Sequence, residues 1–251
     1  MGTRGRSLIA VLASSMAIIG GGCSARVSYP ETRLQRVILP GLGELKEQDI
    51  RGEFGKTIEA TSPASAGVAW LSEAPGDLAS AWTQTPVNEY QRTGILNAVV
   101  EELRQPPFSS VTALPTVPNG PWDDQPSDTT LVVRSAAARF QQDVAVLMQT
   151  GVSQDQGMNV FALGFLGLVT IPFFPGIDLA TGASAELCAI DVRTGVMIAC
   201  TRGRAAAENR FLFPLQTRRV RDEDKERTLR EAAESAATDL RAAVAARLAN
   251  P

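Results

Sequence analysis

Three cysteines and a complete lack of histidine set the chemistry that this sequence can support. Without an imidazole there is no Ser-His or Cys-His nucleophile pair, and no zinc, copper or iron site built on histidine ligands. Cys23 stands near the start, directly after three glycines. Cys188 and Cys200 lie close together in the second half of the chain, an even pair that suits a disulfide in an oxidising compartment.

The first 22 residues have the layout of a secretory signal peptide. Arg4 and Arg6 come first, an uncharged and mostly apolar run follows over residues 8–19, and small residues come last. As a helix this run would span roughly 18 Å, well short of the ~30 Å hydrocarbon core of a bilayer. A segment removed by cleavage is therefore favoured over a stable membrane span.

Residues 18–23 resemble the lipobox of bacterial lipoproteins. The two glycines before Cys23 match the small residues that precede the cleavage site, while Gly20 stands where a leucine is usual. The resemblance implies that the leader is cut before Cys23 and that this cysteine carries lipid, and two or three acyl chains hold a protein stably at a membrane. Ser24 follows in place of an aspartate, which implies attachment to the outer membrane on its periplasmic side. The alternative is an ordinary secretory signal in which Cys23 is incidental.

The remainder has the composition of a folded domain. Removing the leader of 22 residues from the 251 leaves 229, which suits one domain of middling size. Apolar residues make up 44% of the chain, enough for a core, and the formal net charge of −3 speaks against nucleic-acid binding. We expect residues 23–64 to form a lipidated N-terminus and tether, and residues 65–251 a single α/β domain.

Apolar periodicity predicts alternating strands and helices in the first part of that domain. The strands are expected at residues 67–71, 111–114 and 144–148, and the helices at 88–104 and about 128–141. A β-hairpin over residues 183–201 and a long helix from the acidic residues 222–224 to about residue 249 complete the domain. This helix is expected to bury Leu229, Ala232, Ala233, Ala236, Leu240, Val244 and Leu248. The order predicts an α/β fold, a mixed sheet with helices packed on it, with α+β character at its C-terminal end.

The hairpin decides whether Cys188 and Cys200 can bond. A five-residue loop over residues 192–196, with Asp191 opposite Met197, would place the two cysteines directly opposite each other and within disulfide range. A four-residue loop would place them on opposite faces of the sheet. In that case they would be two small buried apolar side chains.

The longest uncharged stretch outside the leader is a second candidate site. Residues 160–174 are almost wholly apolar and include Phe161, Phe165, Phe173 and Phe174. The run is short for a helical span and is interrupted by Pro172. These phenylalanines either contact a membrane or a partner protein, or belong to buried strands.

The acidic clusters at residues 123–124 and 222–224 lack the ligand spacing of a known metal loop, so we expect no metal site and read both as solvated surface.

Taken together, residues 67–246 resemble the rhombotarget-type lipoproteins. The hairpin AELCAIDVRTGVMIACTRG, preceded by a Pro-Gly turn, is the most specific mark of the resemblance. More remotely, the chain is similar to the α/β domain of the curli-secretion channel lipoprotein and of the penicillin-binding-protein activator. The resemblance implies a non-enzymatic envelope lipoprotein with no catalytic residues and no cofactor.

Three functions remain open. The first is a binding or assembly module, held at the membrane by its N-terminal lipid, that docks another envelope protein. The second is a pore-forming or membrane-remodelling oligomer built around residues 161–174. The third is a hydrolase that works through carboxylates, for which Asp178, Glu186 and Asp191 are the acids of the expected strand region. The sequence leaves the oligomeric state open.

Overall fold

The computed structural model describes residues 25–30, 34, 52, 55–71, 87–115, 126–158, 177–211 and 217–249. Within these residues, five strands form one sheet in the order β2-β1-β3-β4-β5. The strands are β1 (Ala64–Trp70), β2 (Phe108–Ala113), β3 (Val144–Met158), β4 (Ile177–Asp191) and β5 (Met197–Phe211), and the helices are α4 (Glu89–Leu103), α5 (Pro126–Arg139) and α6 (Thr217–Ala249). β1 is parallel to β2 and β3, whereas β3, β4 and β5 are successively antiparallel. The predicted α/β fold, with its mixed sheet, late hairpin and long C-terminal helix, is confirmed.

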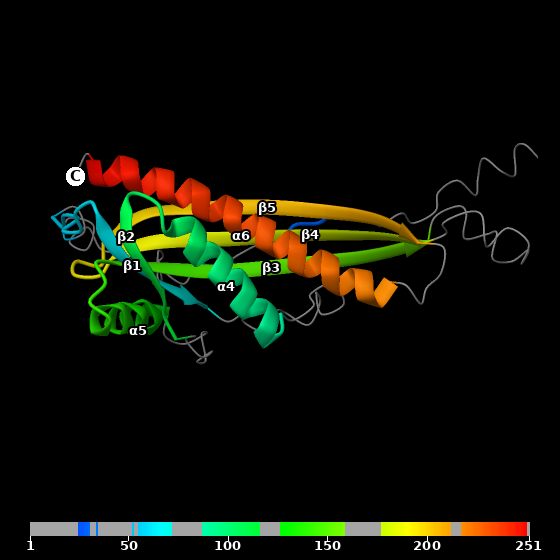
Figure 1. Ribbon diagram of the computed structural model, residues 1–251, viewed down its shortest axis with the longest axis horizontal. Coiled ribbons are helices and arrows are strands. Elements are labelled where there is room, and N and C mark those ends of the chain that lie inside the picture. Colours follow the sequence, from blue (N-terminus) through cyan, green and yellow to red (C-terminus); the bar gives the residue numbers. More distant parts are fainter. Residues whose placement is uncertain are drawn as a thin grey trace, which may run out of the picture.

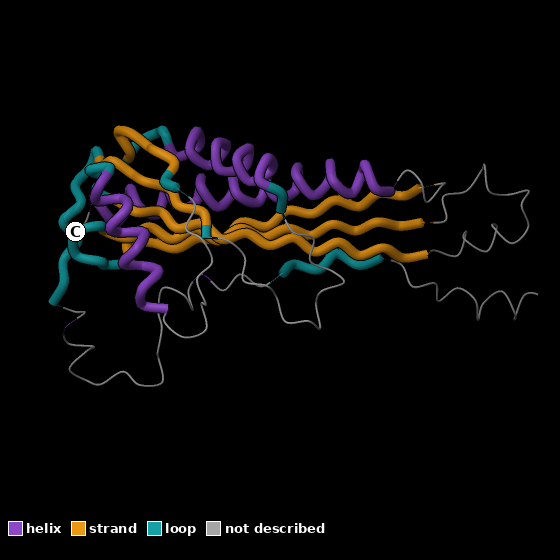
Figure 2. Tube along the Cα trace, turned by 90° about the horizontal axis from the view of Figure 1, so that it is seen from below, coloured by secondary structure: helices purple, strands orange, loops and turns teal. Residues whose placement is uncertain are grey.

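Helices cover the two faces of the sheet unequally (Figure 1). α4 and α6 pack on one face, here called the helix face, and α6 lies along β4 and β5. α5 packs on the opposite face, here called the second face, beneath β1 and the start of β3. Figure 2 shows that β3, β4 and β5 extend well beyond α5. Among the described elements, only the helix face is therefore covered by a helix along most of the long strands.

α4 begins at a capping box. The Asn88 side chain accepts a hydrogen bond from the Gln91 N–H at 2.8 Å, and the Gln91 side chain accepts one from the Asn88 N–H at 3.4 Å. Ile95, Val99 and Leu103 follow at helical spacing and are fully buried. The helix therefore starts and faces the sheet for reasons contained in its own sequence.

α6 buries the apolar residues that the sequence predicted. Leu229, Ala232, Ala233, Ala236, Leu240 and Val244 are fully buried, and Leu248 is partly buried against the same cluster. The alanines let the helix approach β5 closely. The Thr201 hydroxyl donates to the Ala236 carbonyl at 2.7 Å, and a β-carbon on Gly203 would lie 2.0 Å from the Ala232 carbonyl oxygen. Only a glycine fits at position 203 without moving the helix.

Three strands are longer than the sequence predicted. β3 continues past residue 148 to Met158, β4 begins at Ile177 instead of 183, and β5 continues past residue 201 to Phe211. The added residues are mostly polar or small, so apolar periodicity did not reveal them. Their backbone groups are paired along the whole ladder. The three strands end together, with Met158 opposite Ile177 and Ile177 opposite Phe211, and this end of the sheet is called the tip.

The described residues of the expected tether pack on the domain. Leu34 is fully buried in the same apolar cluster as Leu71 and Leu114. Ala60 is buried, and residues 25–30 lie against the second face. The compact part of the chain therefore starts well before residue 65, because segments distant in sequence supply side chains to both sides of the sheet.

Candidate functional site

Residues 25–30, here called the docked segment, cross the second face of β3 and β4 between α5 and the tip (Figure 2). Three hydrogen bonds join it to the sheet: from the Arg26 N–H to Asp155 (2.9 Å), between the Ser28 and Ser153 hydroxyls (2.7 Å), and from the Ser184 hydroxyl to the Pro30 carbonyl (2.7 Å). These bonds fix the direction of the segment, with its first residue nearest the tip.

Two strand glycines make room for the docked segment. A β-carbon on Gly182 would lie 2.0 Å from the Ser28 carbonyl oxygen, and one on Gly151 would lie 2.9 Å from Cγ of Pro30. Glycine inside a strand weakens it and often marks a place where another backbone comes close. The small residues in the middle of β3 and β4 are explained by this close approach.

The docked segment brings the start of the described chain to the tip. Ala25 lines a hollow of about 420 Å³ together with residues 178–180 of β4 and 208–210 of β5. Cys23 lies two positions before Ala25. The described chain therefore begins beside the tip.

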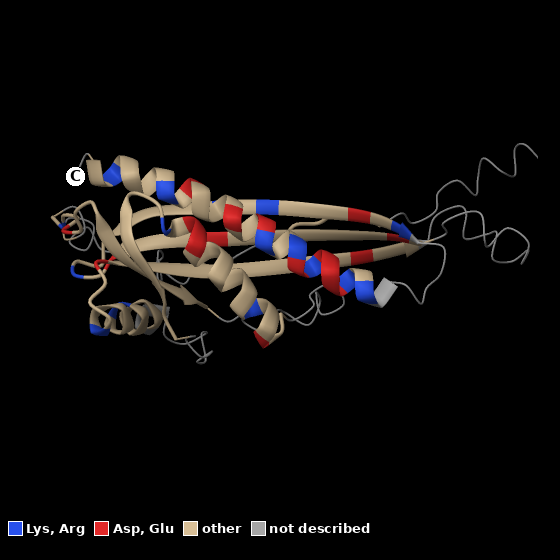
Figure 3. Cartoon of the chain, viewed as in Figure 1, with Lys and Arg blue, Asp and Glu red and all other residues tan. Residues whose placement is uncertain are grey.

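The three arginines of β5 on the second face have partners among the described residues. Arg202 lies 3.4 Å from the buried carboxylate of Glu186, and Arg210 lies 3.6 Å from Asp178. The Arg204 guanidinium sits 5.3 Å from the centre of the Tyr29 ring in the docked segment. Figure 3 shows basic and acidic residues following one another along β5 toward the tip.

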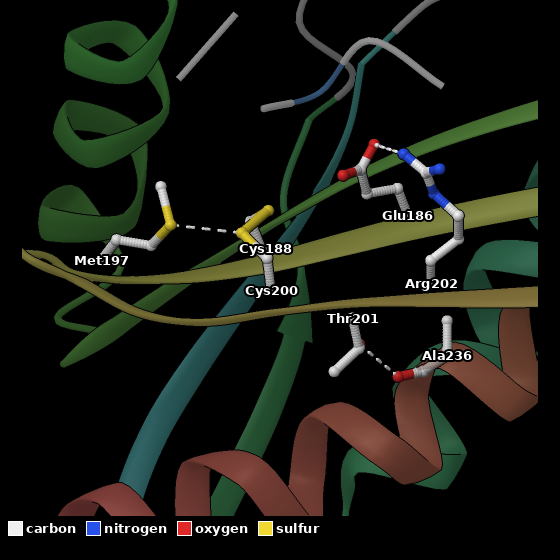
Figure 4. The surroundings of a disulfide bond; sticks show 7 residues. All are labelled: Glu186, Cys188, Met197, Cys200, Thr201, Arg202 and Ala236. Carbon is white, nitrogen blue, oxygen red and sulfur yellow. Dashed lines mark hydrogen bonds and ion pairs between the residues drawn. A yellow bond between two sulfur atoms is a disulfide. The ribbon is translucent and has the colours of Figure 1, made fainter. Parts of the chain in front are cut away.

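Cys188 and Cys200 lie directly opposite each other on β4 and β5 and are joined by a disulfide (Figure 4). Their Cα atoms are 4.1 Å apart, the short spacing of a non-hydrogen-bonded pair. The sulfur of Cys200 also lies 3.3 Å from that of Met197.

The turn of this hairpin is shorter than the five-residue loop that the sequence required for facing cysteines. The Asp191 N–H donates to the Val196 carbonyl at 2.9 Å, which leaves a turn of residues 192–195. The register then shifts: Met197 is opposite Ile190, but Ala199 is opposite Ala189, so Ile198 is an extra residue on β5. Neither alternative drawn from the sequence holds as stated: the turn has four residues, yet the cysteines lie opposite each other, because a β-bulge supplies the one-residue offset that a longer loop would have given.

Asp191 organises this turn from a fully buried position. Oδ1 accepts the N–H groups of Arg193 (2.8 Å) and Thr194 (3.0 Å), and Oδ2 accepts those of Glu59 (2.7 Å) and Ala60 (2.8 Å). Burial alone would raise the pKa of Asp191, but the four N–H groups favour the charged form and hold the pKa below its ordinary value. This carboxylate joins residues 59–60 to the hairpin.

The three acids considered for catalysis do not face one another. Asp178, Glu186 and Asp191 all lie on β4, and the two nearest are about 16 Å apart along an extended strand. Paired carboxylates of glycoside hydrolases stand about 5–9.5 Å apart. Each of the three is already bonded within the chain, to arginines or to backbone N–H groups.

The other predicted site residues, Cys23, Phe161, Phe165, Phe173 and Phe174, lie outside the described residues. Within the described part of the chain, no group of three or more histidine, cysteine, aspartate or glutamate side chains is arranged to hold a metal ion. No helix in that part is both long and apolar enough to cross a membrane.

Sequence reasoning missed the docked segment altogether. Its contacts join residues more than a hundred positions apart, and its own sequence has no apolar period. The usable signal was the Thr-Gly-Ala-Ser run at residues 181–184, where small residues interrupt a buried strand.

No protein-family model matches this sequence, and no curated protein matches it. Solved structures that resemble it superpose with low TM-scores. The lipoprotein GNA1162 from Neisseria meningitidis is 16% identical, with a TM-score of 0.29 over 59% of this chain and 85% of its own. A PelC variant crystallised as a dodecamer, from Paraburkholderia phytofirmans, is 13% identical, with a TM-score of 0.27 over 77% of this chain and 94% of its own.

A third structure is that of a protein described as a homolog of a neuraminyllactose-binding hemagglutinin, from Helicobacter pylori. It is 7% identical, with a TM-score of 0.31 over 78% of this chain and 89% of its own. Superpositions with scores this low say nothing about what this chain binds or does, so the function has to be argued from its own residues.

Proposed function

We propose that this protein is a lipid-anchored lipoprotein of the cell envelope, attached through Cys23 to the periplasmic side of the outer membrane, and that it acts as a non-enzymatic module for binding or assembling another envelope protein. The observation that carries the proposal is the docked segment. Residues just after the lipobox-like motif are bonded across the sheet and end beside the tip. A lipid on Cys23 would therefore hold the domain at a defined end and not on a long free tether.

The use of the acidic residues supports a binding role over an enzymatic one. Glu186 and Asp178 are paired with arginines, and Asp191 accepts four backbone N–H groups. A general acid or base needs a carboxyl group within reach of substrate. These three carboxylates instead join β4 to β5, to the hairpin turn and to residues 59–60.

The position of the tip supports a contact of Phe161, Phe165, Phe173 and Phe174 with the same membrane. The connection that carries these residues leaves the sheet at Met158 and returns at Ile177. That is the end of the sheet at which Ala25 lies. We include this contact in the proposal as a second, weaker attachment.

Fractionation of cells tests the anchor. We expect Cys23→Ala to release the protein into the periplasm, whereas the wild type stays in washed outer membranes. Ser24→Asp serves as the matched variant, because it keeps the lipid and is expected to move the protein to the inner membrane. Full retention of Cys23→Ala in washed outer membranes would contradict the lipid as the main attachment.

Crosslinking in intact envelopes tests the binding role. We expect wild-type protein to be recovered with an envelope protein partner, and Cys23→Ala to lose that partner because it leaves the membrane surface. Recovery of the protein alone, together with turnover of an envelope glycan by the purified chain, would overturn the proposal in favour of a hydrolase.

Vesicle binding tests the second attachment. The Cys23→Ala protein is expected to bind lipid vesicles weakly, and Phe173→Asp added to it is expected to abolish this binding. Equal binding by both proteins would remove the phenylalanines from the proposal.

A further inference from the structure

The large apolar side chains that are exposed in the described part of the chain lie mostly on one side of the sheet. Leu131 and Val132 are on α5, Phe140 directly follows α5, and Tyr29 belongs to the docked segment; these four are between 42% and 54% exposed. Figure 2 shows α5 and the docked segment on the same side of the strands, the second face. The fifth such residue, Tyr90, is on α4, which packs on the helix face. The two sides of the domain therefore present different surfaces.

α5 has a mostly apolar surface on the side that faces away from the sheet. Val133 and Ala137 are fully buried, and the positions that helical spacing places on the outward side are exposed: Leu131, Val132, Ser135, Ala138 and Arg139. Among the α5 side chains that the structure describes, Arg139 is the one exposed charge. Basic and acidic residues instead follow one another along α6 (Figure 3). An exposed apolar surface rimmed by polar residues marks a contact with a membrane or with another protein.

The exposed charges on the second face are mostly positive. Five arginines of α5, β5 and the docked segment are exposed: Arg26, Arg139, Arg202, Arg204 and Arg210. The one exposed acid among the described side chains of this face is Glu208. The other acids there are buried or partly buried and are bonded within the chain. Arginine pairs readily with phosphate, the group that lipid head groups present.

We propose that the second face is the side of the domain that lies on the phospholipid bilayer, with Leu131 and Val132 at the level of the head groups. The inference rests on the proposed function, because it needs the lipid on Cys23. The docked segment begins two positions after Cys23 in the sequence and is bonded to this face. The chain that follows the lipid therefore joins the domain on the side that the bilayer covers. Tyrosine and arginine are residue types that suit the membrane–water interface.

The distribution of these residues favours a bilayer over a protein as the occupant. A protein interface is centred on a compact apolar patch with a polar rim. Here the apolar side chains and the arginines are spread over three elements, α5, β5 and the docked segment. A bilayer surface accepts separate apolar side chains among basic ones, because its head-group region is continuous.

The anchor also explains why a small apolar surface is sufficient. A lipid on Cys23 makes the contact of the second face with the bilayer intramolecular, so a contact too weak to bind lipid by itself is still made. The orientation should therefore depend on the anchor. We expect it to be lost from the Cys23→Ala protein.

Fluorescence quenching of the lipidated full-length protein in vesicles tests this orientation. Leu131→Cys and Tyr90→Cys each add one free thiol for a dye, because Cys188 and Cys200 are bonded to each other and Cys23 carries lipid in the proposed form. The vesicles contain phosphatidylethanolamine and phosphatidylglycerol with acyl chains brominated near the head groups. The dye at position 131 should be quenched at least about twofold more than the dye at position 90, although Tyr90 is the more exposed of the two. Adding Cys23→Ala should remove most of the quenching at position 131.

Sedimentation of the same vesicles separates the orientation from the anchor. If the protein sediments with the vesicles but the dyes at positions 131 and 90 are quenched equally, or neither is quenched, the orientation is wrong and the anchor stands. If the lipidated protein stays in the supernatant, the anchor fails and the orientation fails with it. A dye at position 131 that is unquenched in vesicles, but shielded from an aqueous quencher in intact envelopes, would overturn the bilayer as occupant in favour of a protein.

A charged substitution tests the apolar contact of α5 itself. With the dye on Val132→Cys, adding Leu131→Asp should lower the quenching at least about twofold, because a carboxylate is unfavourable in lipid. Adding Tyr90→Asp is the matched control and should leave the quenching unchanged. Leu131 and Tyr90 are both exposed, so neither change should unfold the domain. Equal quenching in the two variants would overturn the contact of α5 with the bilayer.

Discussion

The carbonyl oxygen of Ser28 occupies the space that a β-carbon on Gly182 would need, with only 2.0 Å between the two positions. The neighbouring Ser153 and Ser184 bond to the docked segment on either side of this contact. The second face of β3 and β4 is therefore shaped for a segment that begins two residues after Cys23.

Replacing Gly182 with valine should displace the docked segment. The added side chain meets backbone atoms that cannot rotate away, so the segment must lift and its hydrogen bonds must break. We expect the chain to become several-fold more sensitive to trypsin after Arg26, measured by mass spectrometry of the released peptide. Gly94→Ala is the control, because a β-carbon there meets only an arginine side chain at 3.8 Å. Unchanged cleavage in Gly182→Val would contradict the docking.

Removing the disulfide should destabilise the hairpin without unfolding the sheet. Cys188 and Cys200 are 12 positions apart, and closing a loop of that length is worth at most about 3 kcal/mol of unfolded-chain entropy. We expect the Cys188→Ser, Cys200→Ser variant to lose about 2–3 kcal/mol of unfolding free energy in urea. The wild type with reductant should show the same loss. If the oxidised and the reduced wild type had the same free energy of unfolding, the bond would not stabilise the fold.

Asp191→Asn should lower the free energy of unfolding more than the same substitution at an exposed aspartate. An amide has one oxygen, so two of the four N–H groups now facing the carboxylate would meet an NH₂ group whichever way the side chain turned. Each unsatisfied buried donor costs about 1–3 kcal/mol. We expect urea denaturation to show a loss of about 2–4 kcal/mol, against little change for the exposed Asp239→Asn. Equal midpoints for the two variants would contradict this role.

The same carboxylate gives a pH dependence of defined sign. The pKa of Asp191 is lowered in the folded state because its N–H donors outweigh the desolvation that burial causes. Its contribution to stability is therefore complete above the unfolded-state pKa of about 3.9 and is lost as the pH falls through the lower folded-state pKa. Urea midpoints of the wild type should fall over this acidic range more steeply than those of Asp191→Asn. Parallel pH profiles would count against the assignment.

Gly203→Ala should separate α6 from β5. Its β-carbon would lie 2.0 Å from the Ala232 carbonyl oxygen, and the helix backbone must move to admit it. Overpacking of this kind costs about 1–3 kcal/mol. We expect a lower melting temperature, with faster hydrogen exchange in α6 near Ala236. A melting temperature equal to that of the wild type would mean that α6 can move to admit the added β-carbon without loss of stability.

The sequence predicted best what depends on local periodicity. The buried stripe of α6 from Leu229 to Val244 follows from helical spacing alone, and the run at residues 144–148 reads as a strand buried on both faces. The extensions of β3, β4 and β5 were not predictable in this way, because they are mostly polar or small residues whose backbone is paired along the ladder, and a side chain such as Gln154 finds its partner in the Arg221 carbonyl, far away in sequence. Ile198 shows a further limit, since a one-residue bulge leaves no mark in the apolar pattern but decides which cysteines meet.

Of the candidate site, the sequence marks Cys23 through the residues before it, and that assignment stays a prediction. The contacts of Ser28 with Ser153 and of Glu59 with Asp191 join positions 125 and 132 apart, and no local pattern encodes them. The spacing that placed Cys188 opposite Cys200 also required a turn and a bulge to act together.

Intact-mass spectrometry of the protein extracted from its membranes tests the central claim most directly. We predict a polypeptide that begins at Cys23 and is heavier than the unmodified chain by a thioether-linked diacyl group and an amide-linked acyl chain. A free thiol on Cys23, or a chain that still carries residues 1–22, would contradict the lipid anchor and with it the envelope function.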